Sequence, residues 1–407
     1  MENIKFLKDY QFKDKRVLLR VDLNVPVVHG KIVDYSRIER VIPTLKFLVK
    51  NKARVIILSH FGRPKGKYDP SLSLSPIVDA INMVMGIDNV KFCVDTIGEQ
   101  AAKDVSKLKN GEILLLENLR FYPGEEKNDA EFVNDLASLG DIYVNDTFSC
   151  SHRKHASIYG LAKKLPSAMG LLFQEEIENL ENILLQPRKP MIAVVGGSKV
   201  STKIDLLKSL ILKADYLVIG GGMANSFLKA KGFSVGKSLC EENLIDAAKE
   251  ILNKASKSNC EIILPIDVIV ADKLIKPNFC KVVDVDNVND NEMILDVGPQ
   301  SVHEICEKID KSKTLIWNGP IGAFEYAPFN IGTESIARYV AYKTNLNEII
   351  SVAGGGDVVA ALKNSGLKDS FSYLSTAGGA FLEWIQGDIG YGMHALQANK
   401  GSISKVS

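Results

Sequence analysis

The chain has 407 residues, of which 46% are hydrophobic and 24% charged, values typical of a globular protein long enough for two domains. Its 50 Lys and Arg balance 49 Asp and Glu, and the net charge of +1 provides no overall field for holding nucleic acid or an anionic membrane. No apolar run of about 18 residues, no signal-like N-terminus and no C-x-x-C pair occurs, so we expect a cytoplasmic protein that spans no membrane.

Short runs of Val, Ile and Leu that end in Gly, Asn, Asp or Ser predict buried strands in both halves of the chain. In the first half they cover residues 16–24, 54–62, 91–94, 112–120 and 141–146. In the second half they cover residues 191–197, 215–222, 261–265, 314–319, 348–356 and 371–379. Longer amphipathic segments separate these runs, a pattern typical of parallel sheets with helices on both faces. We therefore predict an α/β protein with two doubly wound, Rossmann-like lobes.

The segment between the two sets of strands is predicted to be an interdomain helix. Phe173, Ile177, Leu180 and Leu184 recur at helical spacing, and prolines bracket the segment. A cleft between the two lobes is expected, and a C-terminal tail can pack back on the first lobe. The expected boundaries are 1–166 for the first domain, 167–187 for the helix, 188–388 for the second domain and 389–407 for the tail.

Polar and cationic residues follow the predicted strands of the first lobe, at the strand ends where doubly wound sheets bind ligands. They are Asp22, Leu23, Asn24, His60, Phe61, Gly62, Arg63, Arg120, His152, Arg153 and His155. Each alone is more often a solvated charge or a structural histidine. Several arginines aimed at one point repel unless an anion lies between them, and their guanidinium groups fit phosphate oxygens. The first lobe is therefore predicted to bind a phosphorylated or carboxylated substrate.

Arg37 provides a separate indication of an anion. Ser36 and Glu39 predict a capping box, which places Arg37 in the first turn of a helix, where a cation opposes the helix dipole. Either the chain tolerates a cost of about 0.3–1 kcal/mol, or a bound anion cancels it.

The second lobe presents glycines and lysines at its strand ends. Gly196 and Gly197 end the first strand, and Lys199 and Lys203 lie four apart at the start of a predicted helix. Two like charges there are unfavourable, and a phosphate would relieve the repulsion. Further glycine-rich strand ends are IGGGMANSF, WNGPIGAFE and SVAGGGDVV, the last of which carries Asp357. These loops are typical of nucleotide binding.

The common sequence signatures of other enzyme classes are missing. No G-x-G-x-x-G occurs at a strand–helix turn, which disfavours a nicotinamide-dependent dehydrogenase. GFSVGKS, residues 232–238, is one residue too short for a P-loop and follows no convincing strand. Neither G-x-S-x-G nor H-E-x-x-H is present.

Nine segments resemble the phosphoglycerate kinase family in order and spacing across nearly the whole chain. They are RVDLNVP, SHFGRPKG, LLENLRFYPGEE, VNDTFSCSHRKHAS, GGSKVSTKI, GGGMANSFL, WNGPIGAFE, GGGD and YLSTAGGAFLE. A single glycine cluster would be uninformative, but nine collinear segments are highly specific.

The resemblance implies that each lobe binds one substrate. For 3-phosphoglycerate or 1,3-bisphosphoglycerate it implies Asp22, Leu23, Asn24, Arg37, His60, Phe61, Gly62, Arg63, Arg120 and Arg153. For ADP or ATP with Mg²⁺ it implies Gly197, Lys199, Lys203, Gly221, Glu325, Gly354, Gly355, Gly356, Asp357 and Val358. Asp357 would lie beside the metal, Glu325 would hold the ribose hydroxyls, and the implied catalytic residues are Arg37, Lys199, Gly355 and Gly378. The implied mechanism is direct transfer after the lobes of a monomer close.

Some residues depart from the family pattern. Val358 stands where the family has Thr or Ser, and Ala377 where it has Gly. Milder changes are Phe61 for the usual Leu, Ser149 and Cys150 for the usual Gly-Thr, and Phe381 with Trp384 in the last motif. The loss of a hydroxyl near the nucleotide leaves a non-catalytic relative as an alternative, against which the intact arginines and lysines argue.

Overall fold

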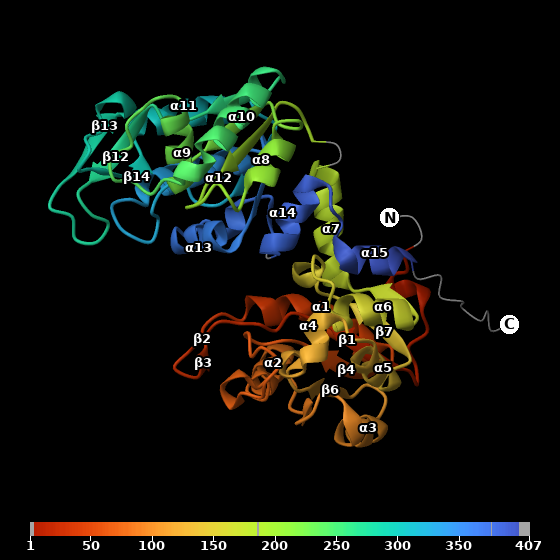
Figure 1. Cartoon of the computed structure of the whole chain (residues 1–407). Helices are drawn as coiled ribbons and strands as arrows, with labels where there is room; N and C mark the ends of the chain where they lie inside the picture. Colours follow the sequence, from red (N-terminus) through yellow and green to blue (C-terminus); the bar gives the residue numbers. More distant parts are fainter. Residues whose placement is uncertain (1–3, 185–186, 376, 399–407) are drawn as a thin grey trace. The chain divides into compact units, whose positions relative to one another are not determined.

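The computed structural model describes residues 4–184, 187–375 and 377–398, which form two compact units (Figure 1). Unit 1 comprises Met1–Glu178 and Ile389–Ser407, and unit 2 comprises Asn179–Asp388. The boundary falls within helix α7 (Leu171–Leu184), through which the chain passes from one unit to the other. The predicted pair of α/β lobes is therefore present, while the cleft between them stays a prediction.

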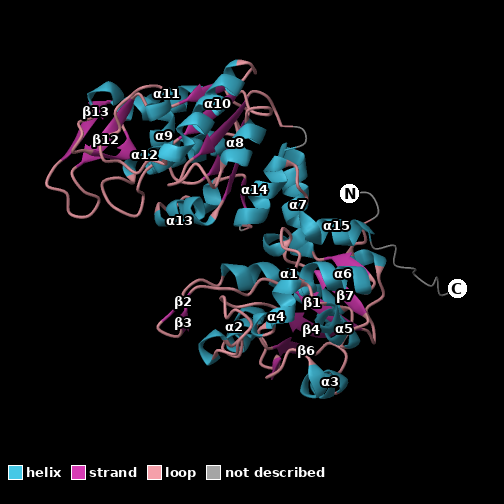
Figure 2. Ribbon diagram, viewed as in Figure 1, coloured by secondary structure: helices cyan, strands magenta, loops and turns pink. Residues whose placement is uncertain are grey.

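Unit 1 is built on a parallel sheet with the strand order β5-β6-β4-β1-β7-β8. Figure 2 labels the four inner strands of this sheet, β6, β4, β1 and β7. Val17 and Leu19 of β1 belong to the core beneath α1 and α2, while the alternate residue, Leu18, is equally buried on the other face. Burial on both faces explains why these strands read as continuous apolar runs. The strands are β1 (Arg16–Arg20), β4 (Arg54–Leu58), β5 (Lys91–Cys93), β6 (Ile113–Leu116), β7 (Ile142–Asn145) and β8 (Ser167–Met169).

Helices of unit 1 include one from the far end of the chain. Residues 389–398 belong to this unit, and α15 packs against α6. Residues 399–407 lie outside the described part. The helices are α1 (Ser36–Lys50), α2 (Ile77–Met85), α3 (Gly98–Ser106), α4 (Pro123–Lys127), α5 (Ala130–Ser138), α6 (Leu161–Lys164) and α15 (Gly390–Ala398).

Unit 2 has a second parallel sheet, with the order β11-β10-β9-β15-β16-β17. The chain first runs outward from β9 to β11 and then returns to pair β15 with the other edge of β9. This reversal creates a switch point between β9 and β15, where doubly wound sheets bind ligands. The strands are β9 (Met191–Val195), β10 (Tyr216–Ile219), β11 (Glu261–Ile263), β15 (Thr314–Asn318), β16 (Ile350–Gly354) and β17 (Tyr373–Ser375).

Helices cover both faces of this second sheet. Trp317 and Leu315 of β15 pack with residues of α11, α12 and α13, while the alternate Ile316 is buried on the opposite face. The helices are α8 (Ile204–Leu210), α9 (Gly222–Ala230), α10 (Ile245–Ser256), α11 (Pro299–Asp310), α12 (Ile331–Asn345), α13 (Gly356–Asn364) and α14 (Gly378–Gln386).

Three groups of strands were not predicted. An antiparallel sheet with the order β13-β12-β14 is inserted between β11 and β15, and one of its strands, β13, is largely exposed. The strands β2 and β3 form a two-residue hairpin, and β8 adds an edge to the first sheet. The unpredicted strands are β2 (Val27–Val28), β3 (Lys31–Ile32), β12 (Asp267–Ala271), β13 (Cys280–Asp284), β14 (Met293–Val297) and β8.

Two local predictions need correction. The interdomain helix expected over 167–187 is shorter, because residues 167–169 pair with β7 as β8 and the helix begins at Leu171. The capping box of Ser36 and Glu39 does not form. Ser36 is already helical, and its backbone N–H and hydroxyl both donate to the Asp34 carboxylate, so Asp34 supplies the stabilising acceptor. Arg37 does lie in the first turn, as predicted.

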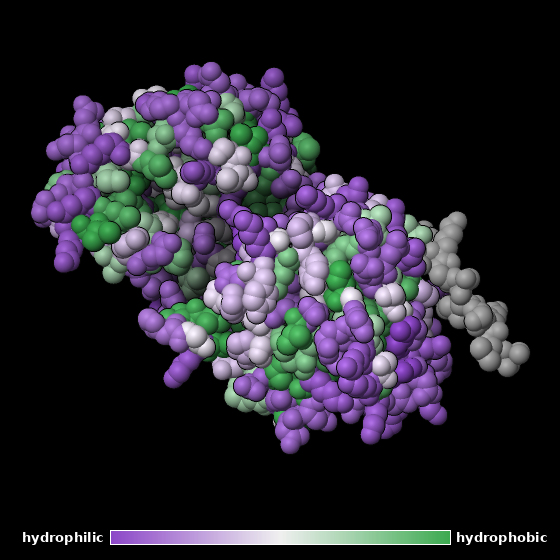
Figure 3. Space-filling model, turned by 60° about the horizontal axis from the view of Figure 1, so that its bottom comes forward, coloured by the Kyte–Doolittle hydropathy of each residue, from purple (hydrophilic) through white to green (hydrophobic). Residues whose placement is uncertain are grey.

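On the face that Figure 3 shows, the surface of each unit is mainly hydrophilic, with scattered hydrophobic residues. Within the part of the chain that the structure describes, no helix is long and apolar enough to cross a membrane. All six cysteines are free thiols.

A buried carboxylate at the end of β7 provides a test of the unit 1 fold. Burial raises the pKa of Asp146 from 3.8 to about 6, and its Oδ1 accepts a hydrogen bond from the Phe173 N–H at 3.1 Å. The folded state therefore favours the protonated acid, and stability present below pH 4 is lost as pH rises through about 6. We expect Asp146→Asn to gain about 3 kcal/mol relative to the parent between these pH values.

Hydrogen exchange of unit 1 amides in the parent and in Asp146→Asn, at pH 4 and pH 7, measures this gain. Asp141→Asn is the matched control, for which we expect a change in stability of the opposite sign. Despite partial burial, hydrogen bonds from Arg16 lower the pKa of Asp141, so this variant should lose stability at neutral pH. A pH-independent difference for Asp146→Asn would contradict the assignment.

Candidate functional site

A cluster of basic side chains lies at the carboxyl ends of the strands of unit 1. Arg20 is 1% exposed, and its Nη2 lies 3.1 Å from Nδ1 of His60, on the loop after β4. Arg120 is also buried and donates from Nη1 to the Gly62 carbonyl at 2.7 Å. Arg153 donates from Nε to Nε2 of His152 at 3.1 Å. The tertiary structure thus brings together the loops that follow β1, β4, β6 and β7.

The histidines of this cluster are held neutral. Burial and the nearby Arg153 lower the pKa of His152 to about 4. Burial and the three arginines lower the pKa of His155 to about 3, and the pKa of His60 is also well below its usual value. The positive field therefore comes from guanidinium groups, which stay charged at any physiological pH. Such a site suits an anion with several oxygens.

One carboxylate is held at the edge of the basic cluster. Asp22 Oδ2 accepts hydrogen bonds from Arg37 Nη1 at 2.8 Å and from Ser149 Oγ at 2.7 Å. Burial alone would raise the pKa of Asp22, but the Arg37 guanidinium and the hydrogen bonds from the Ser149 hydroxyl and the Asn24 N–H hold it below its usual value. Asp22 is therefore an ionised acceptor with a fixed orientation, suited to a substrate hydroxyl group.

The other residues predicted in unit 1 take different positions. Asn24 Oδ1 accepts the Gly62 N–H at 2.9 Å and so joins two of the loops. The side chains of Leu23 and Phe61 are buried in the core, so only their backbones can face a ligand. Arg63 is exposed. Sequence reasoning missed Arg20 and Ser149, although a lone arginine inside the apolar run of β1 was a visible signal.

At the switch point of unit 2, Lys203 joins the carboxyl ends of two strands. Its Nζ donates to the carbonyls of Gly196 at 2.5 Å and Asn318 at 3.2 Å. Asn318 Nδ2 donates in turn to the Gly354 carbonyl at the end of β16. Burial lowers the pKa of Lys203 to about 8, an effect that the charge of Asp357 opposes. A phosphate beside this ammonium group would provide the negative charge that favours its protonated form.

The glycines of these loops are required by close backbone packing. A Cβ on Gly196 would lie 1.9 Å from the Pro320 carbonyl oxygen. Gly221 has φ +66°, and a Cβ there would lie 2.8 Å from the Gly197 carbonyl oxygen. The loops after β9, β10 and β15 can therefore interlock only without side chains at these positions.

Only one of the two lysines predicted at the start of a helix, Lys203, lies there. α8 begins at Ile204, with Lys203 in the preceding position and Lys199 exposed in the loop after β9. The stretch 232–238 follows helix α9 and no strand, which confirms that it is no P-loop.

α13 and α14 each begin at one of the glycine-rich segments. Gly355, at φ +115°, precedes α13, whose first turn contains Gly356, Asp357 and Val358 and offers free backbone N–H groups. Gly378 is the first residue of α14. Asp357 is exposed, whereas the Val358 side chain is fully buried in the core of unit 2.

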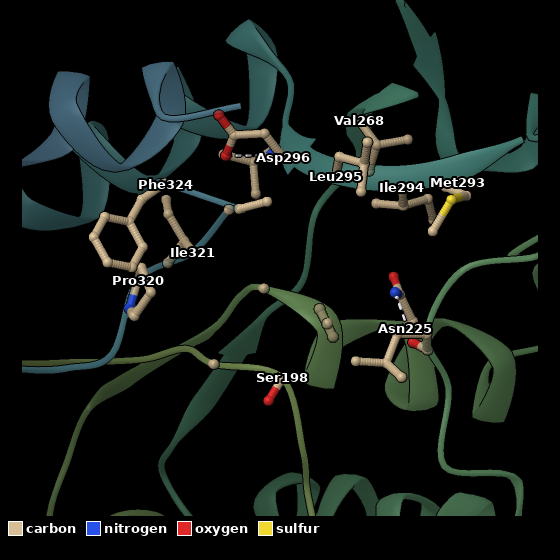
Figure 4. A pocket seen from close by; sticks show the side chains of 18 of the residues that line it. Ser198, Asn225, Val268, Met293, Ile294, Leu295, Asp296, Pro320, Ile321 and Phe324 are labelled. Carbon is tan, nitrogen blue, oxygen red and sulfur yellow. Dashed lines mark hydrogen bonds between the residues drawn. The ribbon is translucent and has the colours of Figure 1, made fainter. Parts of the chain in front are cut away.

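A cavity of about 420 Å³ opens beside the switch point, within unit 2 (Figure 4). Of the predicted nucleotide-binding residues, Gly197, Gly221, Glu325 and Asp357 line it. Sequence reasoning missed its largely apolar wall, which consists of Pro265, Val268, Leu274, Met293, Ile294, Leu295, Val297, Pro320, Ile321 and Phe324. A cavity with apolar walls and a few polar groups is typical of sites for flat organic ligands.

The fold and these two sites define an α/β protein with a cluster of guanidinium groups in one lobe and a cavity of about 420 Å³ at the switch point of the other. Three comparisons with known proteins identify the family. The family model for phosphoglycerate kinase matches residues 7–388. The phosphoglycerate kinase of Chelativorans sp. is 54% identical over 98% of this chain and 100% of its own, and that of Methylobacterium radiotolerans is 53% identical over 95% and 96%.

Solved structures agree. The phosphoglycerate kinase of Coxiella burnetii has a TM-score of 0.86 at 42% identity, covering 97% of this chain and 98% of that one. The enzyme of Pyrococcus horikoshii has a TM-score of 0.84 at 31% identity, with the same coverage. The chain belongs to the phosphoglycerate kinase family. It is a phosphotransferase of the glycolytic reaction between 1,3-bisphosphoglycerate and ADP, and not a nicotinamide-dependent dehydrogenase.

The buried position of Val358 changes what its replacement should do. A threonine hydroxyl there would be buried among apolar side chains, so we expect Val358→Thr to destabilise unit 2 by about 1–3 kcal/mol. MgADP affinity should stay within about twofold of the parent. Thermal unfolding and calorimetric titration measure the two effects, and Val359→Thr at the half-buried neighbour is the control. Tighter MgADP binding by Val358→Thr would show that the hydroxyl reaches the nucleotide.

Proposed function

We propose that this chain transfers the phosphoryl group directly and in line between a phosphoglycerate held in unit 1 and a nucleotide held in unit 2. The observation that supports this most is the division of the two anion sites. The guanidinium cluster of Arg20, Arg120 and Arg153 lies in one unit, and the cavity beside Lys203 lies in the other. Each substrate then has its own half-site, and neither unit is sufficient alone.

In unit 1, the arginines would hold the phosphate and carboxylate groups of 3-phosphoglycerate, with Arg63 and His60 beside them. Asp22, ionised and oriented by Arg37 and Ser149, would accept a hydrogen bond from the substrate hydroxyl. Arg37 would exchange part of its contact with Asp22 for the transferring phosphoryl group. The backbones of Leu23, Phe61 and Gly62 complete this half-site together with Asn24.

In unit 2, the cavity would hold the base and ribose, with Glu325 as acceptor for the ribose hydroxyls. Lys203 and Lys199 would neutralise phosphate charge, and Gly197 and Gly221 allow the backbone to approach it. The backbone N–H groups after Gly354 and Gly355, including those of Gly356 and Val358, and those at Gly378 would donate to phosphate oxygens without reorganising.

Asp357 is the residue that suits Mg²⁺. Among residues 4–184, 187–375 and 377–398, no group of three or more His, Cys, Asp or Glu could form an all-protein metal site. A single exposed carboxylate at a phosphate site fits Mg²⁺, which keeps water and substrate phosphates as its other ligands. When bound, this ion neutralises charge that develops on the phosphates. We also propose a cytoplasmic monomer, consistent with its six free thiols.

A coupled assay tests the proposed reaction. Purified protein is given 3-phosphoglycerate and MgATP, and NADH oxidation by added glyceraldehyde-phosphate dehydrogenase reports the 1,3-bisphosphoglycerate formed. We expect turnover that requires both substrates. Absence of turnover with intact nucleotide binding would favour a non-catalytic relative.

Lys199 offers a specific test of the catalytic assignment. Its side chain is exposed in the loop after β9, next to Gly197. We expect Lys199→Ala to lower kcat by about 10² to 10³ and to change KM for 3-phosphoglycerate little, because it removes a charge contact made in the transition state. Lys231→Ala, at an exposed lysine that follows α9, is the control. A kcat close to the parent's would make Lys199 a solvated surface charge.

Division of the half-sites between two units also predicts closure. In-line transfer requires reacting atoms about 3–3.5 Å apart with water excluded, so two separately loaded units must come together. We expect solution X-ray scattering to give a smaller radius of gyration with 3-phosphoglycerate plus a non-hydrolysable MgATP analogue than with either ligand alone. Equal radii in all four ligation states would contradict closure.

A further inference from the structure

One polar group in the cavity of unit 2 lacks a partner. Asn225 of α9 is 1% exposed and lines the cavity. Its Nδ2 donates to the Leu239 carbonyl at 3.0 Å, but its Oδ1 has no hydrogen-bond partner among the described residues. Buried acceptors without a partner are rare in native proteins, and each one calls for an explanation.

The orientation of this amide is determined by its surroundings. If the oxygen and nitrogen were exchanged, Oδ1 would face the Leu239 carbonyl oxygen, and two acceptors would repel each other. The amide donor therefore faces Leu239, and the acceptor is left on the other side. In Figure 4 the Asn225 side chain extends from α9 toward Ile294 and Leu295 across the cavity.

The environment of the free acceptor is otherwise apolar. Val268, Met293, Ile294 and Leu295 lie around that end of the cavity. Apolar walls suit the faces of a planar heteroaromatic ring, but they provide no hydrogen bond to its edge. Asn225 Oδ1 is thus an acceptor within an apolar compartment, and it requires a ligand with an N–H group at its rim.

We propose that Asn225 is a specificity-determining residue that reads the base of the nucleotide, an inference that rests on the proposed function. Adenine carries an exocyclic amino group at C6, which can donate to Asn225 Oδ1. Hypoxanthine carries a carbonyl oxygen at C6, which would place a second acceptor against the first, and its own N–H group lies at the neighbouring N1 and not at this position. A site built to hydrogen-bond an N–H group rejects an analogue that lacks it, because the buried polar group then remains unpaired.

The alternative role for Asn225 is structural, with its Nδ2 simply holding the Leu239 segment against α9. Ser226, the next residue of α9, provides a matched control for that role. It is also 1% exposed, and its Oγ accepts the Glu241 N–H at 3.3 Å, yet it does not line the cavity. Ser226→Ala therefore loosens the same segment without removing the acceptor that we assign to the base.

Calorimetric titration of the full chain with MgADP and with MgIDP tests the assignment. We expect the parent to bind MgADP at least about tenfold more tightly than MgIDP, the effect of one hydrogen bond to a buried group. Asn225→Leu, similar in volume but apolar, should weaken the affinity for MgADP about tenfold. It should not weaken the affinity for MgIDP, because it removes the acceptor that faces the hypoxanthine carbonyl oxygen. Ser226→Ala should change both affinities by the same factor, so that their ratio stays that of the parent.

Equal affinities of the parent for the two nucleotides would overturn the proposal, and this comparison needs no variant. An equal loss of both affinities in Asn225→Leu would assign Asn225 to the support of Leu239 alone. If the parent turns over MgADP yet gives either of these results, only the assignment of Asn225 is overturned and the proposed function stands. A parent that binds neither nucleotide would overturn the proposed function and this inference with it.

Discussion

The buried ammonium group of Lys203 is the interaction on which the nucleotide site depends. It joins the carboxyl ends of β9 and β15. Between these two parallel strands the order in which the chain adds strands to the sheet of unit 2 reverses. A buried cation bound only to neutral carbonyls is costly unless negative charge is near. Asp357 supplies part of that charge, and its exposed position leaves space for an anionic ligand.

The same physical constraint recurs in unit 1 with different residues. Arg20 and Arg120 are buried close enough to His155 to lower the pKa of this histidine. Burial, Arg153 and Arg20 lower the pKa of Arg120 as well. Glu125 lies fully buried nearby, but burial raises its pKa, so it is a poor counter-charge. Both half-sites thus have more buried positive charge than their own carboxylates balance. The phosphate groups of the two substrates would balance the remaining positive charge in both half-sites.

Rigid backbone packing explains how such charges are held. In unit 2, three glycine loops interlock so closely that a single Cβ would clash with a carbonyl. In unit 1, Asn118 plays a comparable part, since its amide donates to the carbonyls of Phe61 and Leu72 and its oxygen accepts the Phe61 N–H. These contacts fix the loops that carry the two proposed half-sites, and preorganised groups need no rearrangement during a reaction.

The sequence by itself determined the two α/β lobes, because strands buried on both faces are apolar at nearly every position, as in ILLL and MIAVV. It also determined the family, through nine collinear segments. It could not predict β13, which is mostly exposed and lacks an apolar run, whereas the apolar run of the buried β12 was a signal that sequence reasoning missed. Only the tertiary structure decided that Val358 points into the core while Asp357 lines the cavity, and that Ser149 holds Asp22 from 127 residues away. Such contacts depend on which strand ends lie next to each other, and this neighbourhood follows from the topology of the sheet and not from spacing along the chain.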